Sequence, residues 1–86
     1  MRTNADPDPM LLAFGLGVRR RREDMNWSLD VLADRSGLSR SMLIGVEHGR
    51  RNPSLKLIAA LAQALNATMS DLVGEAEPRA APQPAS

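Results

Sequence analysis

Residues that favour the start of a helix recur along this chain at short intervals, and apolar residues at helical spacing follow each one. The five candidate N-caps are Asp8, Ser28, Ser39, Ser54 and Thr68. Pro9 suits the first turn of the first helix, and Asp71, three residues after Thr68, resembles the second half of a capping box. Because no alternating strand pattern lies between these signals, they predict an all-α fold of five short, compactly packed helices.

Turn residues indicate where the helices end. Asn26, Gly37 and Gly49 tolerate the positive φ that closes a helix. The expected helices cover residues 9–25, a segment capped at Ser28 that ends near Ser36, residues 39–48, a segment capped at Ser54, and a segment from Thr68 that stops at Gly74.

The apolar residues divide into those on inward stripes and those outside them. The inward set is Leu11, Phe14, Val18, Met25, Leu32, Ala33, Leu55, Ile58, Leu61, Ala62, Leu65, Met69 and Leu72. The residues left outside are Leu29, Val31, Leu57, Ala60 and Ala64. Those around the fourth helix would suit a subunit interface.

The two ends of the chain differ from its middle. Residues 1–8 lack apolar periodicity, and residues 75–86 are rich in Pro and Ala, so both are expected to be disordered. A single domain is predicted at residues 9–74.

The absence of certain residue types narrows the function. The chain has no cysteine, and its N-terminus has no apolar run of the length that a signal peptide needs, so we expect a soluble cytoplasmic protein without membrane contact. No Ser/His/Asp set, carboxylate pair, phosphate loop or metal-ligand spacing occurs. Neither catalytic residues nor a metal or other cofactor is expected.

The charge is unevenly distributed. The net charge of the whole chain is +1, but residues 14–73 hold nine Lys or Arg against six Asp or Glu. A mild basic excess in the folded part suits a polyanionic partner.

The middle of the chain carries a spaced series of motifs: Trp27-Ser28, Leu32-Ala33, Ser36-Gly37-Leu38-Ser39, Val46-Glu47-His48-Gly49 and Asn52-Pro53-Ser54-Leu55. With these motifs, residues 14–73 resemble the Cro/C1-type, or xenobiotic-response-element (XRE), helix-turn-helix family of phage repressors and bacterial regulators. The resemblance implies a lambda-repressor-like domain, with the helix-turn-helix proper at about 28–48 and its recognition helix, residues 39–48, in the DNA major groove. This sequence departs from the family pattern at Leu29, where family members commonly have Gln, and at Gly45, where they commonly have a long polar residue.

The resemblance also assigns roles to residues. Base contacts are implied for Arg40, Ser41, Ile44 and Gly45. Arg40 could pair with guanine, Ser41 with several bases, and Ile44 could touch a thymine methyl group. Phosphate contacts are expected from Ser28, the Leu29 backbone, Ser39, His48, Arg50, Arg51 and Asn52. A structural salt bridge is implied between Arg22 and Glu47, whereas the rest of the run at 19–22 is expected on the solvated surface and Trp27 in the core.

The function implied is sequence-specific binding of double-stranded DNA by a small transcriptional regulator, in particular a repressor. Homodimers on palindromic operators are usual in this family. A restriction-modification controller and an antitoxin-type autoregulator fit the same sequence. A protein-binding adaptor with this helical fold, or a regulator with a further protein partner, also stays open.

Overall fold

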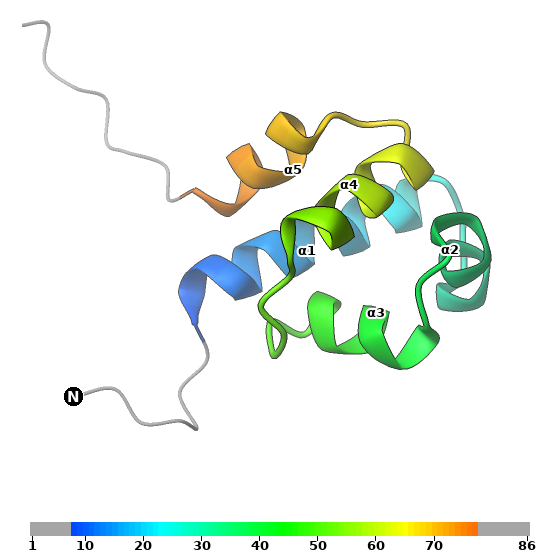
Figure 1. Ribbon diagram of the computed structural model, residues 1–86, viewed down its shortest axis with the longest axis horizontal. Coiled ribbons are helices and arrows are strands. Elements are labelled where there is room, and N and C mark those ends of the chain that lie inside the picture. The colour runs from blue at the N-terminus through cyan, green and yellow to red at the C-terminus, as the bar shows by residue number, and fades with distance from the viewer. Residues whose placement is uncertain (1–7, 78–86) are drawn as a thin grey trace, which may run out of the picture.

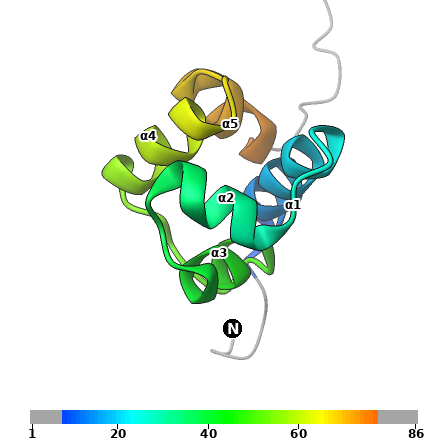
Figure 2. The ribbon, with the colours of Figure 1, turned by 90° about the vertical axis from the view of Figure 1, so that its right-hand side faces the viewer.

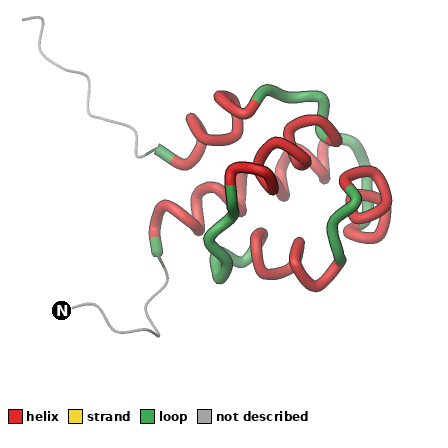
Figure 3. Tube along the Cα trace, in the orientation of Figure 1, coloured by secondary structure: helices red, strands yellow, loops and turns green. Residues whose placement is uncertain are grey.

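Each helix of the structure begins directly after one of the five expected N-caps. The computed structural model describes residues 8–77, which form α1 (Pro9–Asp24), α2 (Leu29–Ser36), α3 (Arg40–Glu47), α4 (Leu55–Ala64) and α5 (Met69–Ala76) (Figure 1). Every cap side chain accepts a hydrogen bond from a backbone N–H in the first turn of its helix. Within residues 8–77 there is no strand (Figure 3). The predicted all-α, five-helix fold is confirmed.

The last helix has the most complete cap. The backbone N–H of Asp71 donates to Thr68 Oγ1 at 3.0 Å, and the backbone N–H of Thr68 donates to Asp71 Oδ2 at 3.0 Å. These contacts lower the pKa of Asp71. The hydrogen bond from the Thr68 backbone has the larger effect, and the hydrogen bond with the Thr68 side chain has the next largest. The capping box predicted for this helix is therefore confirmed.

The turns between helices use the residues expected for positive φ. Asn26 has φ of 60°, Gly37 of 75° and Gly49 of 68°. Asn66, between α4 and α5, adopts φ of 54° in the same way. Each helix end is thus specified locally, and the observed bounds of α1 and α3 differ from the expected ones by one or two residues.

Each helix packs against two others. Helix α1 packs against α3 and against α5, while α2 packs against α3 and α4, and α4 packs against α5. Figure 2 shows α2 in the middle of the view, with α3 below it, α4 and α5 above it and α1 to one side.

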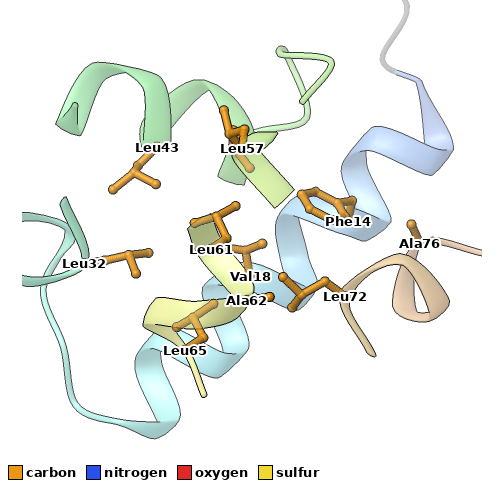
Figure 4. Close-up of a cluster of buried hydrophobic side chains, with 11 residues drawn as sticks. Phe14, Val18, Leu32, Leu43, Leu57, Leu61, Ala62, Leu65, Leu72 and Ala76 are labelled. Carbon is orange, nitrogen blue, oxygen red and sulfur yellow. The ribbon is translucent and has the colours of Figure 1, made fainter. Parts of the chain in front are cut away.

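All five helices supply side chains to one core. Its buried members are Phe14, Val18, Leu32, Leu43, Val46, Leu57, Leu61, Ala62, Leu65, Leu72 and Ala76. Figure 4 shows these side chains pointing into the space enclosed by the helices. Each large member contributes about 1.5–3 kcal/mol by leaving water.

Four expectations about which apolar residues face the core are wrong. Leu55 is 72% exposed, whereas Leu57 is only 7% exposed and belongs to the core. Leu57 lies four residues before Leu61, on the same helix face, but Leu55 lies six residues before it and points about 120° away. Leu29 and Ala64, which were also expected outside the inward stripes, pack against the core. α4 therefore offers fewer free apolar side chains than expected.

The expected stop of the fifth helix at Gly74 is also wrong. α5 continues to Ala76, which is buried because it lies four residues after Leu72 on the same face. Residues 75–77 of the predicted tail therefore belong to the described part of the domain. The rest of that tail, 78–86, and residues 1–7 of the predicted arm lie outside the described residues.

A buried ion pair joins the end of α1 to the end of α3. Arg22 Nε donates to Glu47 Oε2 at 2.7 Å, and Arg22 Nη2 donates to Glu47 Oε1 at 3.0 Å. The side chains are 12% and 5% exposed, respectively. Arg22 Nη1 also donates to the Trp27 carbonyl at 2.7 Å, and the hydrogen bond with Glu47 raises the pKa of Arg22. One guanidinium thus fixes α3 and the turn before α2 to α1.

Glycine lets α1 approach the end of α3 closely. A Cβ atom added at Gly15 would collide with the Val46 carbonyl oxygen and would lie 2.7 Å from that of Glu47. Gly74, by contrast, has no atom within 4 Å of its Cβ direction. Gly15 and Gly74 therefore differ in whether a methyl group can be accommodated.

We expect Gly15→Ala and Gly74→Ala to change stability in opposite directions. The first separates α1 from α3 and should lower the free energy of unfolding by about 1–3 kcal/mol. The second should raise it by about 0.5–1 kcal/mol, because alanine favours helix and the site is open. Urea unfolding followed by circular dichroism measures both. Equal changes in the two variants would contradict the close packing at Gly15.

We expect Glu47→Ala to lower the free energy of unfolding by about 3 kcal/mol, because it leaves the Arg22 guanidinium buried without its carboxylate. Arg19→Ala is the matched control. It breaks the exposed Arg19–Glu23 pair, with both side chains 52% exposed, and should cost no more than about 0.5 kcal/mol. Similar losses for both variants in urea unfolding would show that the buried pair is not a special anchor.

Candidate nucleic-acid interface

α3 has one face in the core and the opposite face in solvent. Leu43, Val46 and Glu47 are buried, which fixes the rotation of the helix about its own axis. Arg40 and Ser41 are exposed at its N-terminal end, and Ile44 is half-buried. Since Arg40 and Ile44 are four residues apart, they lie on the same helix face. Three of the predicted base-contacting residues are thus brought together on a surface that can reach another molecule.

The turn before α3 is held by short-range contacts. The backbone N–H of Leu38 donates to Ser36 Oγ at 3.2 Å, and Leu38 is half-buried against the core. Ser39 Oγ then accepts from the Met42 N–H at 3.0 Å. The Leu38 side chain, packed against the core, and the Ser39 cap therefore set the angle between α2 and α3.

The N-terminus of α2 offers a second polar surface. Ser28 Oγ accepts from the Val31 N–H at 3.2 Å, and helix geometry leaves the N–H groups of Leu29 and Asp30 without intrahelical partners. The Leu29 side chain packs against the core, so only its backbone can serve a phosphate. At both caps the Ser hydroxyl oxygen accepts a hydrogen bond, so the O–H groups of Ser28 and Ser39 can still donate one.

A basic loop lies beside α3. Arg50, Arg51 and Asn52 are exposed, and the Arg50 N–H donates to the Gly45 carbonyl at 2.9 Å. The Arg51 stem packs beside Gly45, since a Cβ atom built there would lie 3.5 Å from that of Arg51. Gly45 is half-buried and carries no side chain toward solvent. A Cβ atom at this position would make ordinary van der Waals contact with Arg51, so the packing of the loop on α3 does not require a glycine here.

Lys56 adds a cation to this region that the sequence interpretation missed. It lines a shallow groove together with Leu38, Met42, Arg51 and Asn52. Because Lys56 precedes the buried Leu57 on α4, its position beside the loop follows from the packing of α4 and not from a sequence motif.

Asp30 is the second residue near this surface that the sequence interpretation missed. Its Oδ1 atom lies 3.2 Å from Arg40 Nε, across the turn between α2 and α3. Both side chains are largely exposed, at 80% for Asp30 and 61% for Arg40. No sequence signal marks this pair, because the two residues meet only once the helices are packed.

His48 lies at the C-terminal end of α3. It is exposed, and its Nδ1 atom is 2.8 Å from the Ile44 carbonyl oxygen. Within residues 8–77, no group of three His, Cys, Asp or Glu side chains is arranged to hold a metal ion.

The arginine run on α1 diverges as expected for consecutive helical residues. Arg19 pairs with Glu23 at 3.2 Å, Arg21 pairs with Glu75 of α5 at 2.5 Å, and Arg22 is the buried anchor. The Arg35 guanidinium lies 5.1 Å from the centre of the Trp27 ring, and that ring packs against the core. These arginines are therefore engaged with different partners and do not act as one cluster.

No single described helix is long and apolar enough to cross a membrane. The only combination that meets the length and composition test is α4 with α5, which meet at a bend of 113°.

Comparison with known proteins gives a family. A helix-turn-helix family model matches residues 18–72. The transcriptional regulator AnsR of Bacillus subtilis is 41% identical over 63 residues, which are 72% of this chain and 54% of AnsR. The immunity repressor of Bacillus phage phi105 is 36% identical over 64 residues, which are 74% of this chain and 44% of the repressor. The chain thus spans about half the length of these relatives.

Solved structures agree with the sequence comparison. The restriction-modification controller protein C.AhdI of Aeromonas hydrophila is 44% identical, with a TM-score of 0.70 over 72% of this chain and 94% of C.AhdI. The clp gene regulator ClgR of Corynebacterium glutamicum is 33% identical, with a TM-score of 0.75 over 84% of this chain and 92% of that chain. With its two capped helices, plugged turn and exposed α3 face, the chain belongs to the Cro/C1-type (XRE) helix-turn-helix family of transcriptional regulators.

Proposed function

We propose that this chain binds double-stranded DNA sequence-specifically and acts as a small transcriptional repressor, with α3 lying in the major groove. The observation that carries the proposal is the exposed end of α3, which begins with Arg40 and is held from behind by the buried pair Arg22–Glu47. An α-helix presented in this way fits the width of the major groove.

Base readout in this proposal is divided among a few residues. Arg40 donates to O6 and N7 of a guanine, Ser41 bonds a neighbouring base, and Ile44 contacts a thymine methyl group. Gly45 has no side chain to offer, so in this proposal it contacts DNA only through its backbone. Sequence-dependent DNA shape supplies the remaining discrimination.

Phosphate contacts position the domain. Arg50, Arg51 and Asn52 are exposed beside α3, and Lys56 lines the adjoining groove. Ser28, Ser39, His48 and the Leu29 amide provide further donors around the helix-turn-helix. The clustering of cations around one exposed helix favours DNA over a protein-binding adaptor, which would not need it.

The proposed regulator works in the cytoplasm as a homodimer on a palindromic operator. A two-fold dimer places two copies of α3 in major grooves about 34–36 Å apart, one turn of B-DNA. Without a second copy, a single domain with few base-reading side chains would contact only one half-site.

A restriction-modification controller is the second candidate within the same class. The supporting observation is the 44% identity to C.AhdI, in an alignment that extends over 94% of that protein. Binding of the DNA upstream of a restriction-modification operon would favour this candidate.

We expect Arg40→Ala and Arg51→Ala to weaken DNA binding in different ways. Loss of Arg40 should remove the base preference at one position of each half-site, about tenfold in relative affinity. Loss of Arg51 should weaken binding to all sequences and reduce the dependence of log K on log salt by about one unit. Fluorescence anisotropy with single-base variants of a selected duplex, at several salt concentrations, measures both effects. An unchanged base preference in Arg40→Ala would rule out its role in readout.

We expect two copies of the chain to bind each complete operator. Native mass spectrometry of the protein with a palindromic duplex should give a complex of two chains per duplex, and one chain with a duplex that carries a single half-site. A single chain on the full palindrome at micromolar protein concentration would contradict the dimer.

A further inference from the structure

Asp30 and Arg40 form an ion pair that links the first turn of α2 to the first residue of α3. The contact joins Arg40 Nε to Asp30 Oδ1 at 3.2 Å. It spans the helix-turn-helix, and it involves the same arginine that is proposed to read a base.

The edge of the Arg40 guanidinium that Asp30 contacts determines whether a base can bind the same side chain. A guanidinium has five N–H donors in a planar fork. The Asp30 carboxylate approaches Arg40 at its Nε atom, which leaves the N–H donors of the two Nη atoms for another partner. A guanine in the major groove needs two parallel donors for its O6 and N7 atoms, which an Nη pair supplies. The carboxylate and the base can therefore bind Arg40 at the same time.

We propose that Asp30 is a positioning residue for base recognition, which holds the Arg40 fork in the plane required by a guanine. This inference rests on the proposed function of α3. In solvent the pair is weak, because both side chains are exposed and screened. On DNA the pair becomes shielded from water, and a restrained Arg40 loses less side-chain freedom when it meets its base.

Asp30 also contributes to specificity by repulsion. A carboxylate near the phosphate backbone disfavours every DNA sequence, and its cost is compensated only where Arg40 finds its guanine. The neighbouring Leu29 has no polar side-chain atom with which to restrain Arg40. Among residues 8–77, Asp30 is the acidic residue that pairs with it.

The opposite interpretation is that Asp30 merely competes with DNA for Arg40. In that case, removal of the carboxylate would free the arginine and strengthen binding to its preferred sequence at least as much as binding to others. The two interpretations thus predict opposite changes in the ratio of specific to random binding.

Asp30→Asn tests the proposal, with Asp34→Asn as a control. Asp34 lies one turn further along α2, is exposed, and forms no ion pair with another residue of the described chain, so its replacement removes the same charge without touching Arg40. The assay is competition binding of the full chain to a duplex that it selects, to duplexes altered at the base pair where Arg40→Ala loses its preference, and to random DNA. Thermal melting of each variant checks that it is folded.

We expect Asp30→Asn to reduce the preference at that base pair at least about threefold and to strengthen binding to random DNA. Asp34→Asn should leave the preference unchanged. In an Arg40→Ala background, Asp30→Asn should have no further effect on the preference, because the group that it positions is absent.

An unchanged or increased preference in Asp30→Asn would overturn the inference while leaving the proposed function intact. An equal loss in Asp34→Asn would also overturn it, since charge alone would then account for the effect. If the unmodified protein shows no preference for any duplex over random DNA, the proposed function fails first, and the inference fails with it.

Discussion

The Arg22–Glu47 ion pair is the contact on which the position of α3 depends. Glu47 is the last residue of α3, and its carboxylate is held by two donors of a guanidinium that belongs to α1. The third contact of that guanidinium, to the Trp27 carbonyl, fixes the chain just before α2 begins. The Arg22 side chain therefore fixes both helices of the helix-turn-helix relative to α1. A buried pair of this kind costs desolvation, but it specifies one arrangement because any shift leaves a charge unpaired.

Packing and charge act together in this arrangement. Gly15 allows the α1 backbone to lie against the last carbonyls of α3, and Leu43 and Val46 bury the inner face of that helix. Only the outer face, with Arg40 and Ser41, is left to solvent. A helix this short has little stability of its own, so its surface is useful only because the core holds it. The proposed DNA contacts depend on this rigid support, since base readout requires side chains at fixed positions.

Local signals made the helices predictable, whereas contacts between helices did not follow from them. The five caps and the positive-φ residues Gly37 and Gly49 act within a few residues of themselves, so they are visible in the sequence. Leu55 and Leu57 were assigned to the wrong sides because the direction of the core relative to α4 depends on helices elsewhere in the chain. Asp30 and Lys56 near the candidate site were missed for the same reason. The Arg22–Glu47 pair was expected only through the family resemblance, because 25 residues separate its members.

The central claim is that the exposed face of α3 selects particular DNA sequences. Selection of bound duplexes from a random pool by the full chain, followed by sequencing, tests it most directly. The account predicts enrichment of a palindrome whose half-sites are centred about one helical turn apart, each with a guanine at a fixed position. A bound pool with the same base composition at every position as the starting pool would contradict it.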